Sequence, residues 1–188
     1  TRTTSSAASD VYKRQILGFA FLIGMDGSEL ENYLLNRPWE KVFDITPEVI
    51  FQTFKEKGLF DVKTMEEILR PIIKSCGYDE SLTLLELYEK TEIDFYIYAT
   101  ELNTLSLVAL SHNTHPSMRV IDAVYQSCAI PPLFKPIIHS ENSECILDGG
   151  VFANYPLHCF LERMPDNIDK NTIFGIKLKQ EQIEEDNI

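Results

Sequence analysis

Apolar residues recur at helical spacing through the first half of the chain. Residues 16–24 are apolar on every side, which is typical of a buried central helix. Start signals precede four further helical stretches: capping boxes at Ser28 with Glu31, Thr64 with Glu67 and Thr83 with Glu86, and a proline at Pro47. Gly77 is expected to end the helix that begins near Thr64. We expect these helices to form a packing layer rather than to carry chemistry.

The pattern changes at Glu92. Residues 93–100 are aromatic and β-branched, so we expect a strand there, followed by others over 105–110, 136–138, 145–147 and 172–178. An amphipathic helix is predicted from Val120 to about Cys128, ended by Pro131 and Pro132, and another helix is expected to open at Pro156. Strands that alternate with helices indicate an α/β fold, a three-layer α/β/α sandwich with a largely parallel sheet.

Composition and charge exclude several classes of function. The 188 residues carry a formal net charge of −12, which argues against nucleic acid as a partner, because phosphate binding needs a basic surface. No apolar run approaches the ~18 residues of a transmembrane segment. The four cysteines show no paired spacing, so we expect intracellular free thiols. The expected location is the cytoplasm, and peripheral association with membranes is compatible with it.

Both ends of the chain differ from its centre. Residues 1–15 are rich in Thr, Ser and Ala, lack periodicity and end near Lys13-Arg14, so we expect a leader that is non-native or disordered and that replaces the genuine N-terminal part. Residues 181–188 form an acidic tail. The domain itself is expected to span residues 16–180.

The clearest candidate for chemistry is Asp148. The apolar run Cys145-Ile146-Leu147 is stopped by Asp148-Gly149-Gly150, which predicts a buried strand that ends next to the carboxylate. Two glycines let another backbone or a ligand approach closely. In an open α/β sheet, ligands bind at this end of the strands. By residue type alone, a turn-forming aspartate explains the pattern better.

Three blocks resemble the C-terminal half of a patatin-like phospholipase domain. They are Ala-Thr-Glu-Leu-Asn-Thr at 99–104, Ser-Cys-Ala-Ile-Pro-Pro-Leu-Phe at 127–134, and Asp-Gly-Gly-Val-x-x-Asn-Tyr-Pro-Leu at 148–157. The resemblance covers roughly residues 16–179. It implies a serine–aspartate dyad that hydrolyses acyl esters of lipids through an acyl-enzyme, with Asp148 as the general base and no histidine between the two. Asn154 and Pro156 are implied to fix the loop behind Asp148.

The serine that this family uses is missing from the sequence. It lies in Gly-x-Ser-x-Gly at a sharp strand-to-helix turn, and none of the eight glycines here flanks a serine in that spacing. The glycine-rich oxyanion loop is absent too. Residues 16–24 resemble the helix that follows the turn, so we expect an N-terminally truncated domain that is inactive by itself. Four other serines are candidate substitutes, but we expect none of them to have a neighbouring base: Ser28, Ser75, Ser117 and Ser127.

The histidines carry weaker signals. His112 and His115 have a spacing that a metal pair could use, but no third ligand is marked and a polar loop explains them better. His139 is isolated, and His158 is expected on a helix surface. No phosphate-binding glycine loop is present, so no cofactor is expected.

Three interpretations of function remain open. The first is a fragment of a lipid acyl hydrolase that acts on a lipid or membrane-surface substrate. The second is a patatin-like lipid-binding or scaffolding domain without catalysis. The third is a generic α/β interaction domain whose Asp-Gly-Gly is only a turn, which the joint match of three blocks disfavours. The lipid, the bond cleaved and the oligomeric state do not follow from the sequence.

Overall fold

The computed structural model describes residues 16–139, 143–153 and 156–163. The chain divides into two compact units, Thr1–Ala153 and Asn154–Ile188. Within the second unit, the described part contains one short helix, α8 (Leu157–Leu161). It follows Pro156, as predicted. Asn154 and the strand predicted over 172–178 lie outside the described residues.

The first unit consists of helices followed by a small sheet. After a helix over residues 16–22, its α-helices are α2 (Gly27–Asn36), α3 (Trp39–Val42), α4 (Pro47–Glu56), α5 (Val62–Ser75), α6 (Leu84–Thr91) and α7 (Val120–Cys128). Its strands are β1 (Ile97–Glu101), β2 (Ser106–Leu110), β3 (Ile137–Ile138) and β4 (Cys145–Asp148), and a 3-10 turn, η1 (Gly149–Val151), follows β4. None of the helices described is long and apolar enough to cross a membrane.

The four strands form one sheet in the order β2-β1-β4-β3. Each of its three pairings is antiparallel, so the prediction of a largely parallel sheet is wrong for the strands described here. The connection from β1 to β2 is a tight turn over residues 102–105, which has no room for the crossover that parallel neighbours need. β4 then pairs with the other side of β1, with Ala99 opposite Asp148.

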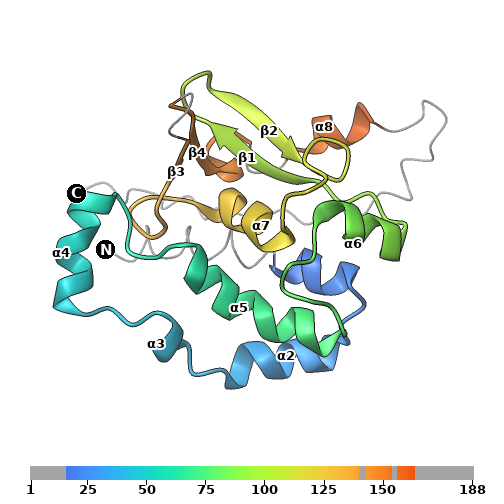
Figure 1. The fold of residues 1–188 in the computed structure, drawn as a ribbon, viewed down its shortest axis with the longest axis horizontal. Coiled ribbons are helices and arrows are strands. Elements are labelled where there is room, and N and C mark those ends of the chain that lie inside the picture. Colours follow the sequence, from blue (N-terminus) through green and yellow to red (C-terminus); the bar gives the residue numbers. More distant parts are fainter. Residues whose placement is uncertain (1–15, 140–142, 154–155, 164–188) are drawn as a thin grey trace, which may run out of the picture. The chain divides into compact units, whose positions relative to one another are not determined.

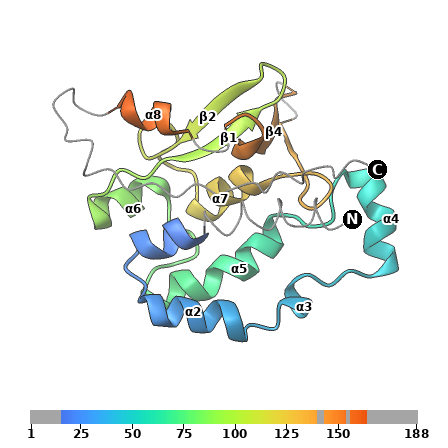
Figure 2. The ribbon, with the colours of Figure 1, turned by 180° about the vertical axis from the view of Figure 1, so that it is seen from behind.

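Helix α7 lies between the sheet and α5, as both views show (Figures 1 and 2). It buries all of its residues except Asp122. Below it, α5 buries the five apolar residues predicted to share one face: Met65, Ile68, Leu69, Ile72 and Ile73. The described α-helices of the first unit lie on the α7 side of the sheet, and together helices and sheet form an α/β fold (Figures 1 and 2).

The helix over residues 16–22 is buried on one face only. Ile16, Phe19 and Ala20 are at most 1% exposed, whereas Leu17 is 44% and Phe21 85% exposed. The prediction of a helix buried on all sides is therefore wrong in this structure. An entirely apolar helix sequence is compatible with burial on every face. Which faces are buried depends on the elements that pack against the helix.

Only one of the three predicted capping boxes is present. Thr83 and Glu86 satisfy each other's backbone N–H groups at the start of α6, as predicted. The boxes at Ser28 and Thr64 are wrong, because α2 and α5 begin earlier. Asp26 caps α2 by accepting from Ser28 N, and Asp61 caps α5 by accepting from Lys63 N. An aspartate is as good an N-cap as serine or threonine, so the upstream residue sets the boundary.

Candidate active site

Asp148 is the last residue of β4 and is only 1% exposed. Its Oδ1 atom accepts a hydrogen bond of 2.6 Å from Gly150 N and so caps the turn η1. A carboxylate held by a backbone N–H in this way has one oriented oxygen and little water around it. The side chain is therefore fixed at the end of a strand, as the sequence pattern predicted, although only Ile146 and Asp148 of that strand are buried.

The backbone of Asp148 is held from two sides by segments far apart in sequence. Its N–H donates to the carbonyl of Ala129 at 3.1 Å. Its carbonyl accepts from the hydroxyl of Thr100 at 2.9 Å, and Thr100 is fully buried. These contacts bring the block at 99–104 and the block at 127–134 to the Asp-Gly-Gly block. The three segments that carry the family resemblance meet at Asp148.

The carbonyl group of Tyr98, in β1, packs closely against Gly149 and accepts a hydrogen bond from Ser127. A Cβ atom on Gly149 would overlap the Tyr98 carbonyl oxygen, so this position accepts only glycine without a backbone shift. The Ser127 hydroxyl, on α7, donates to this oxygen at 2.6 Å. The first glycine of Asp-Gly-Gly therefore permits the close packing of η1 on β1.

Glu101 is a second buried carboxylate near the site, but it is committed to the β1–β2 turn. It is 6% exposed and accepts from Asn103 N at 2.9 Å and from Thr104 N at 2.7 Å. The Thr104 hydroxyl also donates to it, and these hydrogen bonds hold the pKa of Glu101 below its usual 4.5. We therefore assign it a structural role.

The four serines considered as substitutes for the missing nucleophile have other surroundings. Three of them donate their hydroxyl protons to groups other than Asp148. Ser75 donates to Ile72 O at 2.9 Å within α5, and Ser127 is 1% exposed and donates to Tyr98 O. The expectation that Ser28 has no neighbouring base is wrong, because its hydroxyl donates to the Asp26 carboxylate, which caps α2. Ser117 lines a cavity beside α7. A serine that already donates its proton to a backbone carbonyl is poorly prepared to give it to a base.

The two loop histidines have different partners. The His112 ring stacks on Tyr88 with a centroid distance of 3.8 Å, and its Nε2 atom lies 3.7 Å from Asp94. His115 has Nδ1 3.0 Å from the Thr114 hydroxyl. In the part of the chain that the structure describes, no three His, Cys, Asp or Glu side chains form a group that could hold a metal ion. In the second unit, His158 Nε2 lies 3.1 Å from the Cys159 thiol.

The backbone groups that contact Asp148 and Gly149 could not be predicted from the sequence. The carbonyls of Ala129 and Tyr98 hold Asp148 and accommodate Gly149, yet a carbonyl has no residue type by which it could be recognised. The sequence indicated Thr100 only as a member of the block at 99–104 that resembles the family. Its hydrogen bond to the Asp148 carbonyl is seen only in the structure.

The fold and site define an α/β domain in which strand β4 ends in an Asp-Gly-Gly turn with a buried aspartate. The sequence model of the patatin-like phospholipase family matches residues 16–161, and the chain belongs to this family. The chain is also 24% identical, over 139 residues, to "Probable lipid hydrolase 463L" of Invertebrate iridescent virus 6. That match covers 73% of this chain and 47% of the viral protein, so the chain spans about half of that relative.

Proposed function

We propose that this chain is the part of a lipid acyl hydrolase that carries the general base, Asp148, of a serine–aspartate dyad. The observation that supports it most is the meeting of the three family blocks at the backbone of one buried aspartate. Thr100 and Ala129 hold the backbone of Asp148 from two other segments, and its side chain is buried between them. Membership of the patatin-like phospholipase family supplies the reaction class.

In the proposed reaction, a serine hydroxyl attacks the carbonyl carbon of a lipid ester while the Asp148 carboxylate takes its proton. Collapse of the tetrahedral intermediate breaks the ester bond, and Asp148 gives the proton to the departing alcohol. A water molecule then attacks the acyl-enzyme by the same two proton transfers. An aspartate has an ordinary pKa near 4, so it needs close contact and a partly dry setting to act as a base. Its 1% exposure supports that setting.

The nucleophile belongs, in this proposal, to sequence that this chain does not contain. Gly-x-Ser-x-Gly and the oxyanion loop are absent from the 188 residues, and the helix over 16–22 resembles the one that follows the nucleophile turn. The parallel strands of a three-layer sandwich would then belong to the same missing part. We therefore propose that residues 16–180 are a partial domain, flanked by a non-native leader and an acidic tail, and that the chain alone is inactive.

The substrate proposed is an ester lipid, met in the cytoplasm or at a membrane surface. The name of the viral relative supports a lipid hydrolase, and the family name supports phospholipids. A second candidate, a lipid-binding domain without catalysis, is supported by the absence of Gly-x-Ser-x-Gly from the sequence. The coding sequence upstream of residue 16 separates the two, because the hydrolase requires that motif shortly before Ile16.

Asp148→Asn in the protein extended by its upstream coding sequence tests the base. We expect hydrolysis of a short-chain p-nitrophenyl ester to fall by about 10²- to 10⁴-fold, the usual contribution of a general base. Asp79→Asn is a matched control, since Asp79 only caps a turn through Ser81. Equal activity of the two variants would remove Asp148 from the mechanism, and an inactive wild-type protein would favour the non-catalytic domain.

A further inference from the structure

The carbonyl group of Asp148 lies where β4 ends and η1 begins. Asp148 is the last residue of β4 and is opposite Ala99 in the neighbouring strand β1. Its carbonyl accepts from the hydroxyl of Thr100, the next residue of β1, at 2.9 Å. Thr100 is 0% exposed, so water cannot readily replace this donor. A buried side chain of β1 therefore holds the junction between the strand and the turn.

The Thr100 hydrogen bond orients the peptide group between Asp148 and Gly149. Asp148 has φ −49° and ψ 131°, and ψ is the rotation that sets the direction of this peptide group. The same rotation determines the position of Gly150 N, which donates to Asp148 Oδ1 at 2.6 Å. A rotation of the peptide group would change both the start of η1 and the anchor of the carboxylate. The Thr100 hydroxyl thus acts on the carboxylate through the backbone of the turn.

Two other contacts restrict different parts of the turn. Asp148 N donates to Ala129 O at 3.1 Å, which holds the peptide group before Asp148. Gly149 packs against the Tyr98 carbonyl, which limits how η1 approaches β1. Two consecutive glycines have little conformational preference of their own, so hydrogen bonds have to define the direction in which the chain leaves the strand. Thr100 supplies such a hydrogen bond on the side of the turn that follows Asp148.

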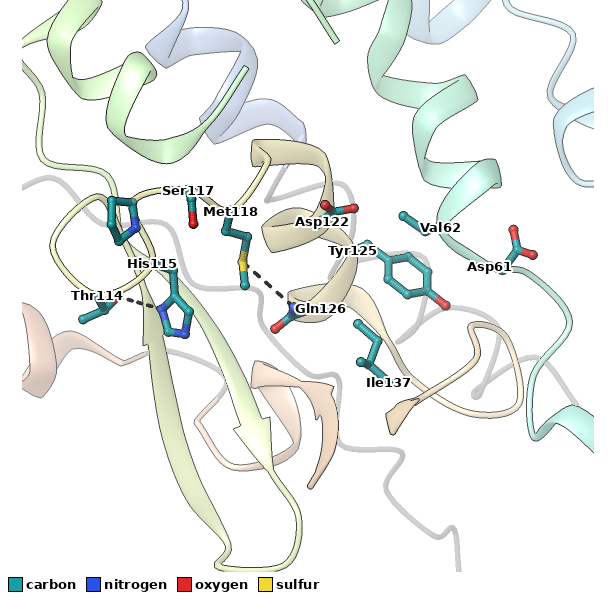
Figure 3. Close-up of a pocket in the computed structure, with 11 residues that line it drawn as sticks. Asp61, Val62, Thr114, His115, Ser117, Met118, Asp122, Tyr125, Gln126 and Ile137 are labelled. Carbon is teal, nitrogen blue, oxygen red and sulfur yellow. Dashed lines mark hydrogen bonds between the residues drawn. The ribbon is translucent and has the colours of Figure 1, made fainter. Parts of the chain in front are cut away.

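Thr100 is too deeply buried to touch a substrate itself. A cavity of about 630 Å³ lies beside α7, and several segments line it, with Tyr125 and Gln126 of α7 among them (Figure 3). Among the described residues, neither Thr100 nor Asp148 belongs to its lining. A change at Thr100 therefore leaves this cavity intact. Any effect of Thr100 on turnover has to act through another residue, and its hydrogen bond points to Asp148.

We propose that Thr100 is a positioning residue for Asp148, whose hydroxyl fixes the Asp148–Gly149 peptide group and thereby the direction of the carboxylate. This inference rests on the proposed function, in which Asp148 takes a proton from a serine. A general base has to lie within hydrogen-bond reach of the proton that it takes, and a small displacement slows the reaction strongly. The buried hydroxyl of Thr100 would keep the carboxylate of Asp148 within that reach.

Thr100→Val, in the protein extended by its upstream coding sequence, removes the hydroxyl and keeps the branched shape. We expect kcat for a short-chain p-nitrophenyl ester to fall by about tenfold and KM to stay within about twofold, because a misplaced base slows the chemical step and not binding. Thr100→Ser keeps the donor and should restore kcat to within about threefold of the wild type. The matched control is Thr91→Val, because the Thr91 hydroxyl also donates to a backbone carbonyl, Leu87 O in α6, at 2.8 Å. Its kcat should equal that of the wild type.

Asp148→Asn, measured beside these variants, separates the inference from the proposed function. If Asp148→Asn is as active as the wild type, or if the wild type is inactive, the proposed function fails and the inference fails with it. If Asp148→Asn is inactive, the inference alone is wrong in three cases: Thr100→Val has the kcat of Thr91→Val, Thr100→Ser is as slow as Thr100→Val, or the loss lies in KM. If Thr100→Val does not fold, Thr100→Cys replaces it in the comparison with Thr100→Ser, because a thiol is a weak donor.

Discussion

At the scale of single residues, Gly149 shows how a sequence motif can encode backbone packing as well as chemistry. Gly149 is buried against Tyr98, where a methyl group would overlap a backbone carbonyl that cannot rotate away. The requirement for glycine is thus steric, and it holds whether or not Asp148 is catalytic. A family motif such as Asp-Gly-Gly therefore combines one candidate reactive group with at least one residue that serves the fold.

Gly149→Ala is expected to lower the free energy of unfolding by about 2–3 kcal/mol, because the added methyl group must displace η1 from β1. Gly18→Ala is the control, since its Cβ would meet nothing within 4 Å in the helix over residues 16–22. That change should be neutral or stabilise by up to about 1 kcal/mol. Urea unfolding of the two variants decides; a Gly149→Ala protein as stable as Gly18→Ala would show that the turn relaxes freely.

Glu101→Gln tests the carboxylate that holds the β1–β2 turn. The hydrogen bonds from Thr104 and Asn103 lower the pKa of Glu101 below 4.5 in the folded state. Its ionised form therefore stabilises the fold above the unfolded-state pKa, and this contribution is lost as the pH falls through the lower folded-state pKa. We expect the stability difference between wild type and Glu101→Gln to be constant at neutral pH and to shrink below about pH 4.5. A difference that does not change with pH would contradict this.

At the scale of elements, the sequence located most helices and strands, but their starts depended on competition between neighbours. The helices at Pro47 and at Val120–Cys128 and the capping box at Thr83 agree with the structure. The boxes at Ser28 and Thr64 do not, because an aspartate upstream was available as a cap. Several residues near a helix start can accept the first N–H groups, and packing of the first turn decides which one does.

Thr83→Ala and Thr64→Ala are a matched pair of variants that test which of the two threonines caps a helix. The Thr83 hydroxyl accepts a hydrogen bond from Glu86 N at 3.2 Å. Its loss in Thr83→Ala should lower the free energy of unfolding by about 1 kcal/mol. Thr64 lies within α5, where alanine is the better helix former, so its replacement should cost nothing or stabilise slightly. Thermal unfolding of both variants is the measurement. Equal losses would restore Thr64 as a cap.

The direction of strand pairing was the larger error at this scale. The order of elements suggested parallel neighbours, yet β1 and β2 are joined by a turn over residues 102–105 with no helix between them. Register and direction depend on which strands meet in space, and a list of elements along the chain does not contain that information. The rule that ligands bind at the carboxyl end of parallel strands thus pointed to Asp148 from a premise that the described sheet does not satisfy.

At the scale of the whole molecule, the candidate dyad and the cavity differ in how far sequence could reveal them. Asp148 could be singled out because its neighbours in sequence carry a family signature. The cavity could not, because residues from Asp61 to Ile137 line it and no local pattern unites them. A site formed by one sequence motif can be predicted from the sequence. A site formed by several segments that pack together can be identified only in the folded structure.

The central claim is that Asp148 is a base whose serine partner lies outside these 188 residues. Labelling with a fluorophosphonate, which modifies activated serines, tests it most directly, with the labelled peptide identified by mass spectrometry. The 188-residue chain should stay unlabelled, and the protein extended by its upstream coding sequence should be labelled at one serine before Ile16, with the label strongly reduced in Asp148→Asn. Labelling of Ser117, Ser127 or any other serine between residues 16 and 188 would contradict the claim.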